Sequence, residues 1–263
     1  MRDKYYFISD IHLGIRSSKE FNKFQELLLI DFLNEIQSDA KELFIIGDLF
    51  DCWIEYKRVV PKGYYKLFTK ISELTEAGVK ITYFAGKHDF WRGKYFKEEF
   101  GIEIEHTGKS LEIDGKKFFL NHGDGLAYND TGYRILKKIL RSPVSQKLYS
   151  LLHPNFGIWL ATSSSASSRE YTSKKDWSGK DGLRDFALNK LDEGYDYVVM
   201  GHRHLPIVIE KNNQKYYINL GDWIRNFTYG VFKDGNFRLM KYYDYDSKKV
   251  VNTDYKKNND KKE

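Results

Sequence analysis

Short apolar runs along the chain end in clusters of small and polar residues, and stretches of helical periodicity separate them. Five runs have strand length and are rich in β-branched and aromatic side chains. With their clusters they cover residues 4–12, 42–51, 80–89, 117–124 and 197–204. Apolar residues recur at helical spacing over 21–37 and 64–77. This alternation predicts a layered α/β core, in which ligands bind beyond the carboxyl ends of the strands.

The segment 128–184 interrupts this rhythm. Helical patterns at 132–140 and 145–152 stand on either side of Pro143, and an apolar run then leads into a serine-rich string. We therefore predict that 128–184 is an inserted helical cap. The core is then formed by residues 1–127 and 185–250.

Two more strands and a tail are expected toward the C-terminus. The apolar runs at 216–220 and 237–243 predict strands in antiparallel pairings. The segment 251–263 is polar, carries charges of both signs and lacks apolar periodicity, so we predict a disordered tail there.

The composition narrows the class of protein. The chain has 263 residues, 41% of them hydrophobic, which suffices for a substantial core. No stretch approaches the roughly 20 apolar residues of a membrane span. The single cysteine, Cys52, excludes an internal disulfide framework and a cysteine-rich zinc site. The first residues lack the apolar region and cleavage site of a signal peptide, so we expect a cytoplasmic protein.

Positive charge is concentrated in the cap. The chain has a net charge of +6, and the stretch 131–184 alone has ten Lys or Arg against three Asp or Glu. A solvated helical face explains such a run, and so does a segment that meets an anion such as phosphate, nucleic acid or an anionic membrane. Charge alone leaves both interpretations open.

Histidines gather in the strand-end clusters. Imidazole and carboxylate together bind divalent ions such as Mn, Fe or Zn, and a shared carboxylate can bridge two of them. Two ions about 3.5–4 Å apart can clamp a phosphate and activate a water. Five of the seven histidines lie within two residues of a glycine or an aspartate, namely His12, His88, His122, His202 and His204.

The clusters together resemble the calcineurin-like metallophosphoesterases. The motifs are Asp10-x-His12, Gly47-Asp48-x-x-Asp51, Gly86-Lys87-His88-Asp89, His122-Gly-Asp124 and Gly201-His202-x-His204. Their order and spacing cover most of the chain. The resemblance implies an αββα sandwich, with the helical cap inserted, and two divalent metal ions, of which manganese is expected.

The same resemblance implies the ligands of each ion. One ion would be held by Asp10, His12, Asp48 and His204. The second would be held by Asp48 as a bridge, the residue at position 87, His122 and His202. His88 then contacts phosphate and acts as a general acid, and Asp89 orients it. We expect Asp51 and Asp124 to support ligands rather than to bind metal.

One branch of the family is more similar than the rest, the UDP-2,3-diacylglucosamine diphosphatases of lipid A synthesis. The run Gly-Asp-Leu-Phe-Asp-Cys-Trp at 47–53 is similar to the pattern of that branch. The cap pattern Ser-x3-Thr-x2-Lys at 168–175 is similar too, although a flexible linker also explains it. The substrate contacts that this resemblance implies are His88, Asp130, Tyr133, Arg134, Ser168, Thr172, Lys175 and His202.

The branch implies a reaction and its partners. Water would attack one phosphorus of the diphosphate in line, giving UMP and 2,3-diacylglucosamine 1-phosphate. The substrate is a UDP-linked acylated glucosamine lipid of the inner membrane, so the charged and apolar cap predicts peripheral membrane contact. The pattern predicts no oligomeric state.

Position 87 departs from the family pattern. The family has an asparagine there, whose carbonyl oxygen binds the second metal, and this chain has Lys87. A protonated lysine has three donors and no acceptor, so it cannot replace that ligand. The lysine can swing away, its charge can replace the second ion, or it can bind metal in its neutral form. We expect slow hydrolysis or operation with one metal.

Two other functions stay open at this point. The chain can be a different metallophosphoesterase, such as a nucleotide phosphodiesterase or a nuclease. The aromatic residues near the cap form no evident stacking platform, so we expect no nucleic-acid partner. Lys87 also motivates a third hypothesis, a catalytically disabled binding protein.

Overall fold

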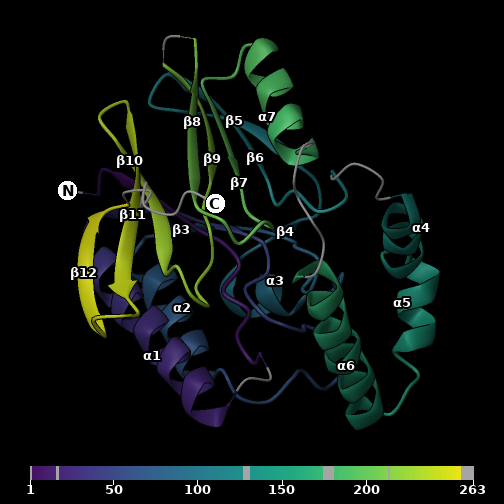
Figure 1. Ribbon diagram of the computed structural model, residues 1–263. Helices are drawn as coiled ribbons and strands as arrows, with labels where there is room; N and C mark the ends of the chain where they lie inside the picture. Colours follow the sequence, from purple (N-terminus) through teal and green to yellow (C-terminus); the bar gives the residue numbers. More distant parts are fainter. Residues whose placement is uncertain (1, 16–17, 127–130, 174–180, 213, 256–263) are drawn as a thin grey trace.

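The computed structural model describes residues 2–15, 18–126, 131–173, 181–212 and 214–255. Two β-sheets pack face to face, and helices cover their outer faces (Figure 1). The predicted αββα order of layers is therefore confirmed.

The first sheet has seven strands with a parallel centre. Strands β1, β2 and β3 run parallel, with Phe7 opposite Phe44 and Phe44 opposite Thr82. The carboxyl ends of these three strands therefore meet at one edge. The order across the sheet is β12 (Lys249–Asp254), β11 (Asn236–Asp244), β10 (Thr228–Lys233), β1 (Lys4–Ile8), β2 (Ala40–Ile46), β3 (Lys80–Phe84) and β4 (Ile104–Glu105).

The second sheet has five strands, and its centre is parallel as well. Strand β7 runs parallel to β6 and to β9, so the ends of β6 and β7 also share an edge. The order is β5 (Lys109–Ile113), β6 (Lys116–Asn121), β7 (Tyr197–Met200), β9 (Lys215–Asn219) and β8 (Ile207–Lys211).

Three apolar layers hold the sandwich together. Phe7, Phe44 and Phe118 are almost fully buried between the two sheets. Helices α1 (Lys19–Ile36), α2 (Tyr65–Glu76) and α3 (Tyr95–Phe100) lie on the first sheet, where α1 contributes Phe32. Helix α7 (Gly182–Asp192) covers the second sheet with Leu183. Burial of each large apolar side chain contributes on the order of 2–3 kcal/mol.

Local signals set the bounds of the helices. The Ser18 hydroxyl accepts the Phe21 N–H and caps the first turn of α1, so this helix begins two residues before the predicted position 21. Helix α2 stops before Gly78, whose φ of 87° favours glycine.

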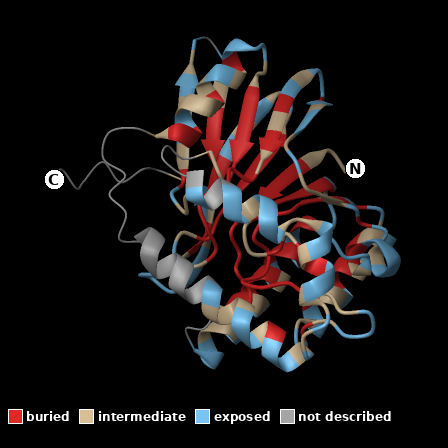
Figure 2. Cartoon of the chain, turned by 90° about the vertical axis from the view of Figure 1, so that its right-hand side faces the viewer, coloured by how far each residue is buried: buried red, intermediate tan, exposed pale blue. Residues whose placement is uncertain are grey.

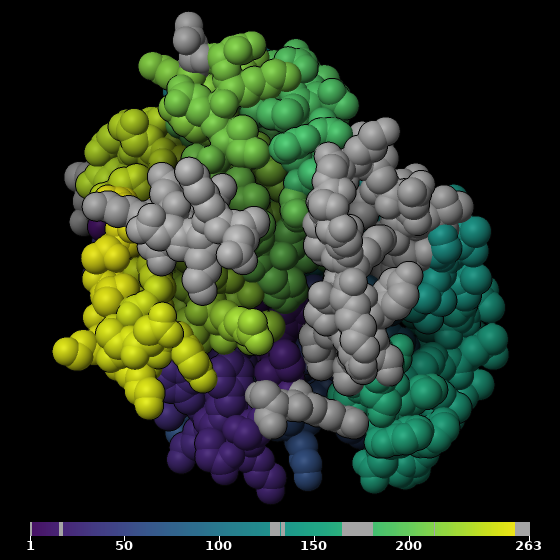
Figure 3. Space-filling view, in the orientation of Figure 1, coloured from purple at the N-terminus to yellow at the C-terminus, as the bar shows by residue number. Residues whose placement is uncertain are grey.

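Three helices of the cap lie between β6 and α7 in sequence. They are α4 (Thr131–Leu140), α5 (Pro143–Tyr149) and α6 (Pro154–Ser173). They stand to one side of the sheets, beyond the strand ends (Figure 1), and they form one flank of the molecule (Figure 3). Their surface is mostly exposed or intermediate, in contrast to the strands (Figure 2).

The cap differs from the prediction in three details. Pro143 does not break a helix but begins α5 behind the Ser142 cap, where a missing N–H costs nothing. The apolar run and the serine-rich string form one continuous helix, α6. The predicted boundary at residue 185 falls inside α7, which begins at Gly182 and buries Leu183 against the second sheet.

Two C-terminal predictions need correction. Strand β9 pairs parallel with β7 and only its other neighbour, β8, is antiparallel, whereas β11 is antiparallel throughout as predicted. The disordered tail predicted at 251–263 is wrong for 251–254, which form most of the edge strand β12. Main-chain pairing with β11 holds this strand, and its side chains are largely exposed, so no apolar periodicity marks it. Residues 256–263 lie outside the described residues.

Candidate metal centre

The strand-end residues of both sheets converge. Asp10 and His12 follow β1, and Asp48 follows β2, all from the first sheet. His122 follows β6, and His202 and His204 follow β7, all from the second sheet. The two groups are separated in sequence by α2, β3, α3, β4 and β5, and the cap and α7 lie between His122 and His202, so the fold brings these residues together.

Their inner atoms lie close enough to share metal ions. His12 Nε2 is 3.7 Å from Asp10 Oδ1 and 3.6 Å from Asp48 Oδ2. Asp48 Oδ2 is also 3.2 Å from His122 Nε2, so this carboxylate stands between two groups of ligand atoms. Within the described part of the chain, these groups are Asp10–His12–His204 and Asp48–His122–His202, and His88 lies near His12 and Asp48.

The outer oxygens of both carboxylates are held by hydrogen bonds. Asp10 Oδ2 accepts the Ser9 hydroxyl at 2.6 Å and the His202 N–H at 2.8 Å. Asp48 Oδ1 accepts the His88 N–H at 2.8 Å. Each carboxylate therefore turns its other oxygen, Oδ1 of Asp10 and Oδ2 of Asp48, toward the histidines.

The histidines are oriented in the same way. His122 Nδ1 lies 2.8 Å from the Ile46 carbonyl oxygen, which accepts a hydrogen bond from the Nδ1–H. His12 Nδ1 lies 3.4 Å from Asp51 Oδ1, and His204 Nδ1 lies 3.4 Å from Asp222 Oδ2. In all three rings the Nε2 atom is left facing the carboxylates, which is the arrangement typical of metal-binding histidines.

The ligand atoms that face the centre of the cluster are suited to binding a metal ion. Asp10 Oδ1, His12 Nε2 and His122 Nε2 are buried and have no hydrogen-bond partner among the described residues. Buried polar atoms are rarely left unpaired, because desolvation costs free energy. Divalent ions would satisfy these oxygen and nitrogen donors. The residues present therefore fit the predicted metal pair.

The backbone of the cluster is strained. Asp10, His12, Asp48, His202 and His204 all have φ between 53° and 71°, a left-handed region that non-glycine residues seldom adopt. Such residues cost on the order of 1–3 kcal/mol each and persist where the surrounding structure holds them. Close packing does so here, since a Cβ on Gly86 would lie 2.2 Å from Asp48 Oδ1.

A family comparison decides the class of protein. The family model described as calcineurin-like phosphoesterase matches residues 4–206, which include every residue of the cluster. This chain belongs to the calcineurin-like phosphoesterase family.

Similar proteins extend the family match. The chain is 34% identical over 259 residues to the UDP-2,3-diacylglucosamine hydrolase of Porphyromonas gingivalis, which covers 92% of this chain and 98% of that protein. It is 28% identical over 242 residues to the protein of the same name from Haemophilus influenzae, with 90% and 98% covered. A solved phosphoesterase from E. coli has a TM-score of 0.44 at 16% identity and covers 94% of this chain and 96% of that one.

The charges of this phosphoesterase cluster suit a cation. Burial opposes the charged form of His12, but the neighbouring Asp10 and Asp51 carboxylates outweigh it and raise its pKa to about 10. The pKa of His122 is raised to about 10 against burial as well, chiefly by Asp48. The pKa of Asp48 is lowered by the histidines despite burial. Ionised carboxylates that hold protons on imidazole will also attract a metal ion, which displaces those protons.

His88 and Asp89 have different surroundings. Burial, opposed by Asp48, lowers the pKa of His88 to about 4, so this ring is neutral at pH 7. Asp89 is fully buried and accepts the Gly86 N–H at 2.6 Å, the Leu49 N–H at 2.7 Å and the Tyr83 hydroxyl. Asp89 thus ties the loop after β3 to the loop after β2, which sequence reasoning did not foresee.

An apolar cavity of about 400 Å³ adjoins the cluster between core and cap. The core contributes Trp53, Ile54, Phe90 and Trp91. The cap contributes Leu136, Leu140, Tyr149, Leu160 and Ala161. Asp51, Lys87 and His88 also line it, so the cavity reaches the edge of the metal cluster. Lys87 therefore faces this cavity.

The side chains of the six predicted substrate contacts in the cap all lie outside the described part of the structure. Asp130 and Lys175 lie outside the described residues. Tyr133 and Arg134 belong to α4, and Ser168 and Thr172 to α6, but their side chains lie outside the described part of the structure. His88 and His202 do lie in the cluster.

Asp222 is the main residue that sequence reasoning missed. It follows β9 in a Gly-Asp pair, the same signal that marked the other clusters. Its Oδ1 accepts the N–H groups of Ile224, Arg225 and Asn226, which leaves Oδ2 toward His204. Burial raises the pKa of Asp222, but His204 and these donors outweigh it, and the pKa is lowered.

Proposed function

We propose that this phosphoesterase hydrolyses the diphosphate of UDP-2,3-diacylglucosamine to UMP and 2,3-diacylglucosamine 1-phosphate. One water is consumed, its oxygen forms a new bond to one phosphorus, and the bridging P–O bond breaks. The observation that carries this proposal is the apolar cavity beside the metal cluster, because a diphosphate with acyl chains needs both. The name of the P. gingivalis relative supports the same substrate.

The metal ions would be held by the residues predicted from the sequence, and we propose manganese. The first would be bound by Asp10, His12, Asp48 and His204, and the second by Asp48, His122 and His202. Bound ions supply positive charge to the phosphates and lower the pKa of water. Oxygen and imidazole ligands suit manganese.

His88 contributes a neutral hydrogen bond in this proposal. Because its pKa is about 4, the ring carries one proton and has one N–H to donate. It can hold a phosphate oxygen in place, but it has no second proton to give to a leaving group at pH 7. Asp89 acts by fixing the loop that carries His88 rather than by touching substrate.

Lys87 is proposed to bind substrate instead of metal. It lines the cavity next to His88, where the diphosphate would meet the acyl chains. An ammonium there attracts phosphate. Three protein side chains then remain for the second ion, so we expect this ion to bind more weakly than the first.

The cap is proposed to contact the membrane that holds the substrate. Of the 17 exposed large hydrophobic residues in the described chain, ten belong to the cap, nine on α4, α5 and α6 and one, Leu151, on the turn after α5. They are Ile135, Leu136, Ile139, Leu140, Val144, Leu148, Leu151, Phe156, Trp159 and Leu160. Within the described residues, no helix is long and apolar enough to cross a bilayer.

Release of UMP tests the substrate. The purified protein with manganese is given detergent-dispersed UDP-2,3-diacylglucosamine, DNA or bis-p-nitrophenyl phosphate. We expect UMP release from the lipid to be the fastest reaction. The variant Leu160→Glu places a charge in the cavity and should raise KM for the lipid, whereas Val208→Glu, at an exposed position on β8, should not. Faster cleavage of DNA would favour a nuclease, and binding without turnover a disabled protein.

A further inference from the structure

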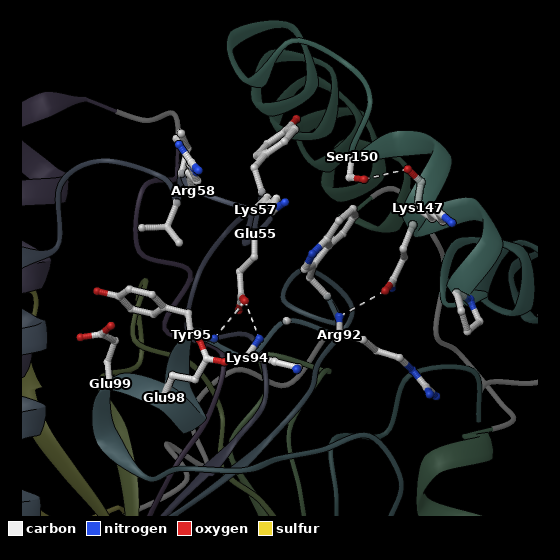
Figure 4. Close-up of a pocket in the computed structure, with 17 residues that line it drawn as sticks. Glu55, Lys57, Arg58, Arg92, Lys94, Tyr95, Glu98, Glu99, Lys147 and Ser150 are labelled. Carbon is white, nitrogen blue, oxygen red and sulfur yellow. Dashed lines mark hydrogen bonds between the residues drawn. The ribbon is translucent and has the colours of Figure 1, made fainter.

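A second hollow, of about 680 Å³, lies where core and cap meet on the side of α3 and α5 (Figure 4). Residues 55–60, residues 91–95 and parts of both helices line it. It holds no residue of the metal cluster. Five cations from three segments surround it, and we name it the basic hollow: Lys57, Arg58, Arg92, Lys94 and Lys147.

The structure describes no ionic partner for these five cations. In the described ranges, none of their side-chain nitrogens lies within 4.0 Å of a carboxylate oxygen, whereas many other lysines of the chain are paired. All five side chains are exposed. A cluster of unpaired cations raises the local positive potential and attracts anions.

The three acidic residues of the hollow offset part of this charge but leave an excess of cations. Glu55 accepts the N–H groups of Lys94 and Tyr95 at 2.7 and 3.0 Å and the Trp53 ring N–H at 2.9 Å. Its carboxylate is therefore used to fix the loop. Glu98 and Glu99 belong to α3 and lie at the end of the hollow away from the cap helix (Figure 4).

Helix α5 joins the basic hollow to an apolar surface. One side of the helix and its following turn, with Gln146, Lys147 and Ser150, lines the hollow. Val144, Leu148 and Leu151 follow at spacings of four and three residues, so they form a separate stripe. These three side chains are 62–78% exposed. Basic side chains next to exposed apolar ones are typical of surfaces that lie on anionic membranes.

We propose that the basic hollow binds the phosphate headgroup of an anionic phospholipid while the stripe of α5 lies in the bilayer interface. The proposal rests on the proposed function for its membrane contact and adds the chemical class of lipid. The long, unpaired side chains around an open hollow suit a headgroup at a surface. The headgroup thus orients the cap, and the cavity between core and cap is held at the membrane from which substrate comes.

Vesicle binding tests this site. The metal-loaded protein is sedimented with phosphatidylglycerol or phosphatidylcholine vesicles, beside a variant with Lys57→Ala, Arg58→Ala and Lys147→Ala. Each basic residue near an anionic surface contributes about fivefold to binding, so three together contribute on the order of 100-fold. We expect that loss on phosphatidylglycerol and little change on phosphatidylcholine. The control Lys19→Ala, Lys23→Ala and Lys66→Ala removes three exposed charges from α1 and α2 and should lose far less.

Further measurements separate the alternatives. Equal losses in the two triple variants would overturn the site, because binding would then follow net charge alone. Displacement of the protein from vesicles by soluble glycerol phosphate at low concentration would overturn the lipid assignment in favour of a small-anion site. UMP release from detergent-dispersed substrate should be unchanged in the hollow variant, because Lys57, Arg58 and Lys147 line neither the substrate cavity nor the metal cluster. If the wild-type protein releases no UMP but still binds vesicles in a charge-dependent way, only the proposed substrate would be overturned.

Discussion

The guanidinium of Arg141 lies 3.0 Å from the carboxylate of Asp124, and this ion pair joins the cap to the loop that carries His122. The same nitrogen donates to the Gly86 carbonyl at 2.7 Å, directly before Lys87 and His88. Lys137 of α4 adds a second cation at 2.7 Å from Asp124. The cap is therefore tied to two loops of the metal centre at once.

Loss of Arg141 should affect the lipid substrate more than a small one. Arg141→Ala leaves Asp124 with one cation and frees the cap, so we expect kcat for UDP-2,3-diacylglucosamine to fall up to about 100-fold through misplaced substrate. Cleavage of bis-p-nitrophenyl phosphate, which needs no cap, should fall much less. Lys138→Ala, an exposed neighbour on α4, is the matched control. Equal losses on both substrates would mean that Arg141 acts on the metal loops alone.

The ionised Asp124 carboxylate should contribute to the free energy of unfolding, and this contribution should depend on pH. Burial opposes its ionisation, but Arg141, His122 and Lys137 outweigh burial and lower its pKa to about 2, below the ordinary 3.8. A lowered folded-state pKa stabilises the fold above the unfolded value and is lost as pH falls toward 2. Asp124→Asn should therefore cost about 2 kcal/mol at neutral pH. Urea unfolding of the metal-free protein should show this difference shrinking between pH 4 and pH 2.

Lys87→Asn should strengthen the second metal site. The asparagine supplies a carbonyl oxygen, and loss of the lysine removes a cation from its surroundings. We expect tighter binding of a second manganese, by about 10–100-fold, in isothermal titration calorimetry. The kcat for UMP release should rise with it, and KM for the lipid should rise too, because the phosphate loses the Lys87 ammonium. Lys62→Asn, an exposed lysine outside the site, is the control. If wild type already binds two ions tightly, the weak second site is refuted.

Asp222→Asn should weaken the first metal site without loss of fold. The amide keeps the size of the side chain but carries no charge to hold the proton on His204 Nδ1. We expect metal affinity to fall about 10–100-fold, measured by calorimetry, with the melting temperature of the metal-free protein nearly unchanged. Asp246→Asn, on an exposed turn, should alter neither value. A lower melting temperature with normal metal affinity would assign Asp222 a purely structural role.

The residues of the metal cluster could be predicted from the sequence more readily than the residues that orient them. Asp10, His12 and Asp48 follow apolar strands in motifs of a few residues, so local pattern finds them. The support of His204 by Asp222 joins residues 18 positions apart and depends on the parallel pairing of β7 and β9. No local pattern shows which strands will be neighbours, and for the same reason β9 was given the wrong pairing.

The cap shows the same limit. The sequence predicts its helical character but not the length of α6, because serine has a low helix propensity. The ion pair between Arg141 and Asp124 spans 17 residues and was not foreseen. The prediction of a disordered tail from residue 251 is wrong for 251–254 because main-chain pairing with β11 holds β12. Such pairing requires no particular side chains, so the sequence does not show it.

Because the cluster is divided between two sheets, the geometry of the metal centre depends on how the sheets are aligned with each other. Asp10, His12 and Asp48 move with one sheet, and His122, His202 and His204 move with the other. A slip of one sheet by a single residue is about 3.3 Å, whereas metal–ligand distances tolerate about 0.2 Å. Both ions can therefore bind only when the two sheets are stacked as in the native fold, and bound metal in turn stabilises this stacking by linking one sheet to the other.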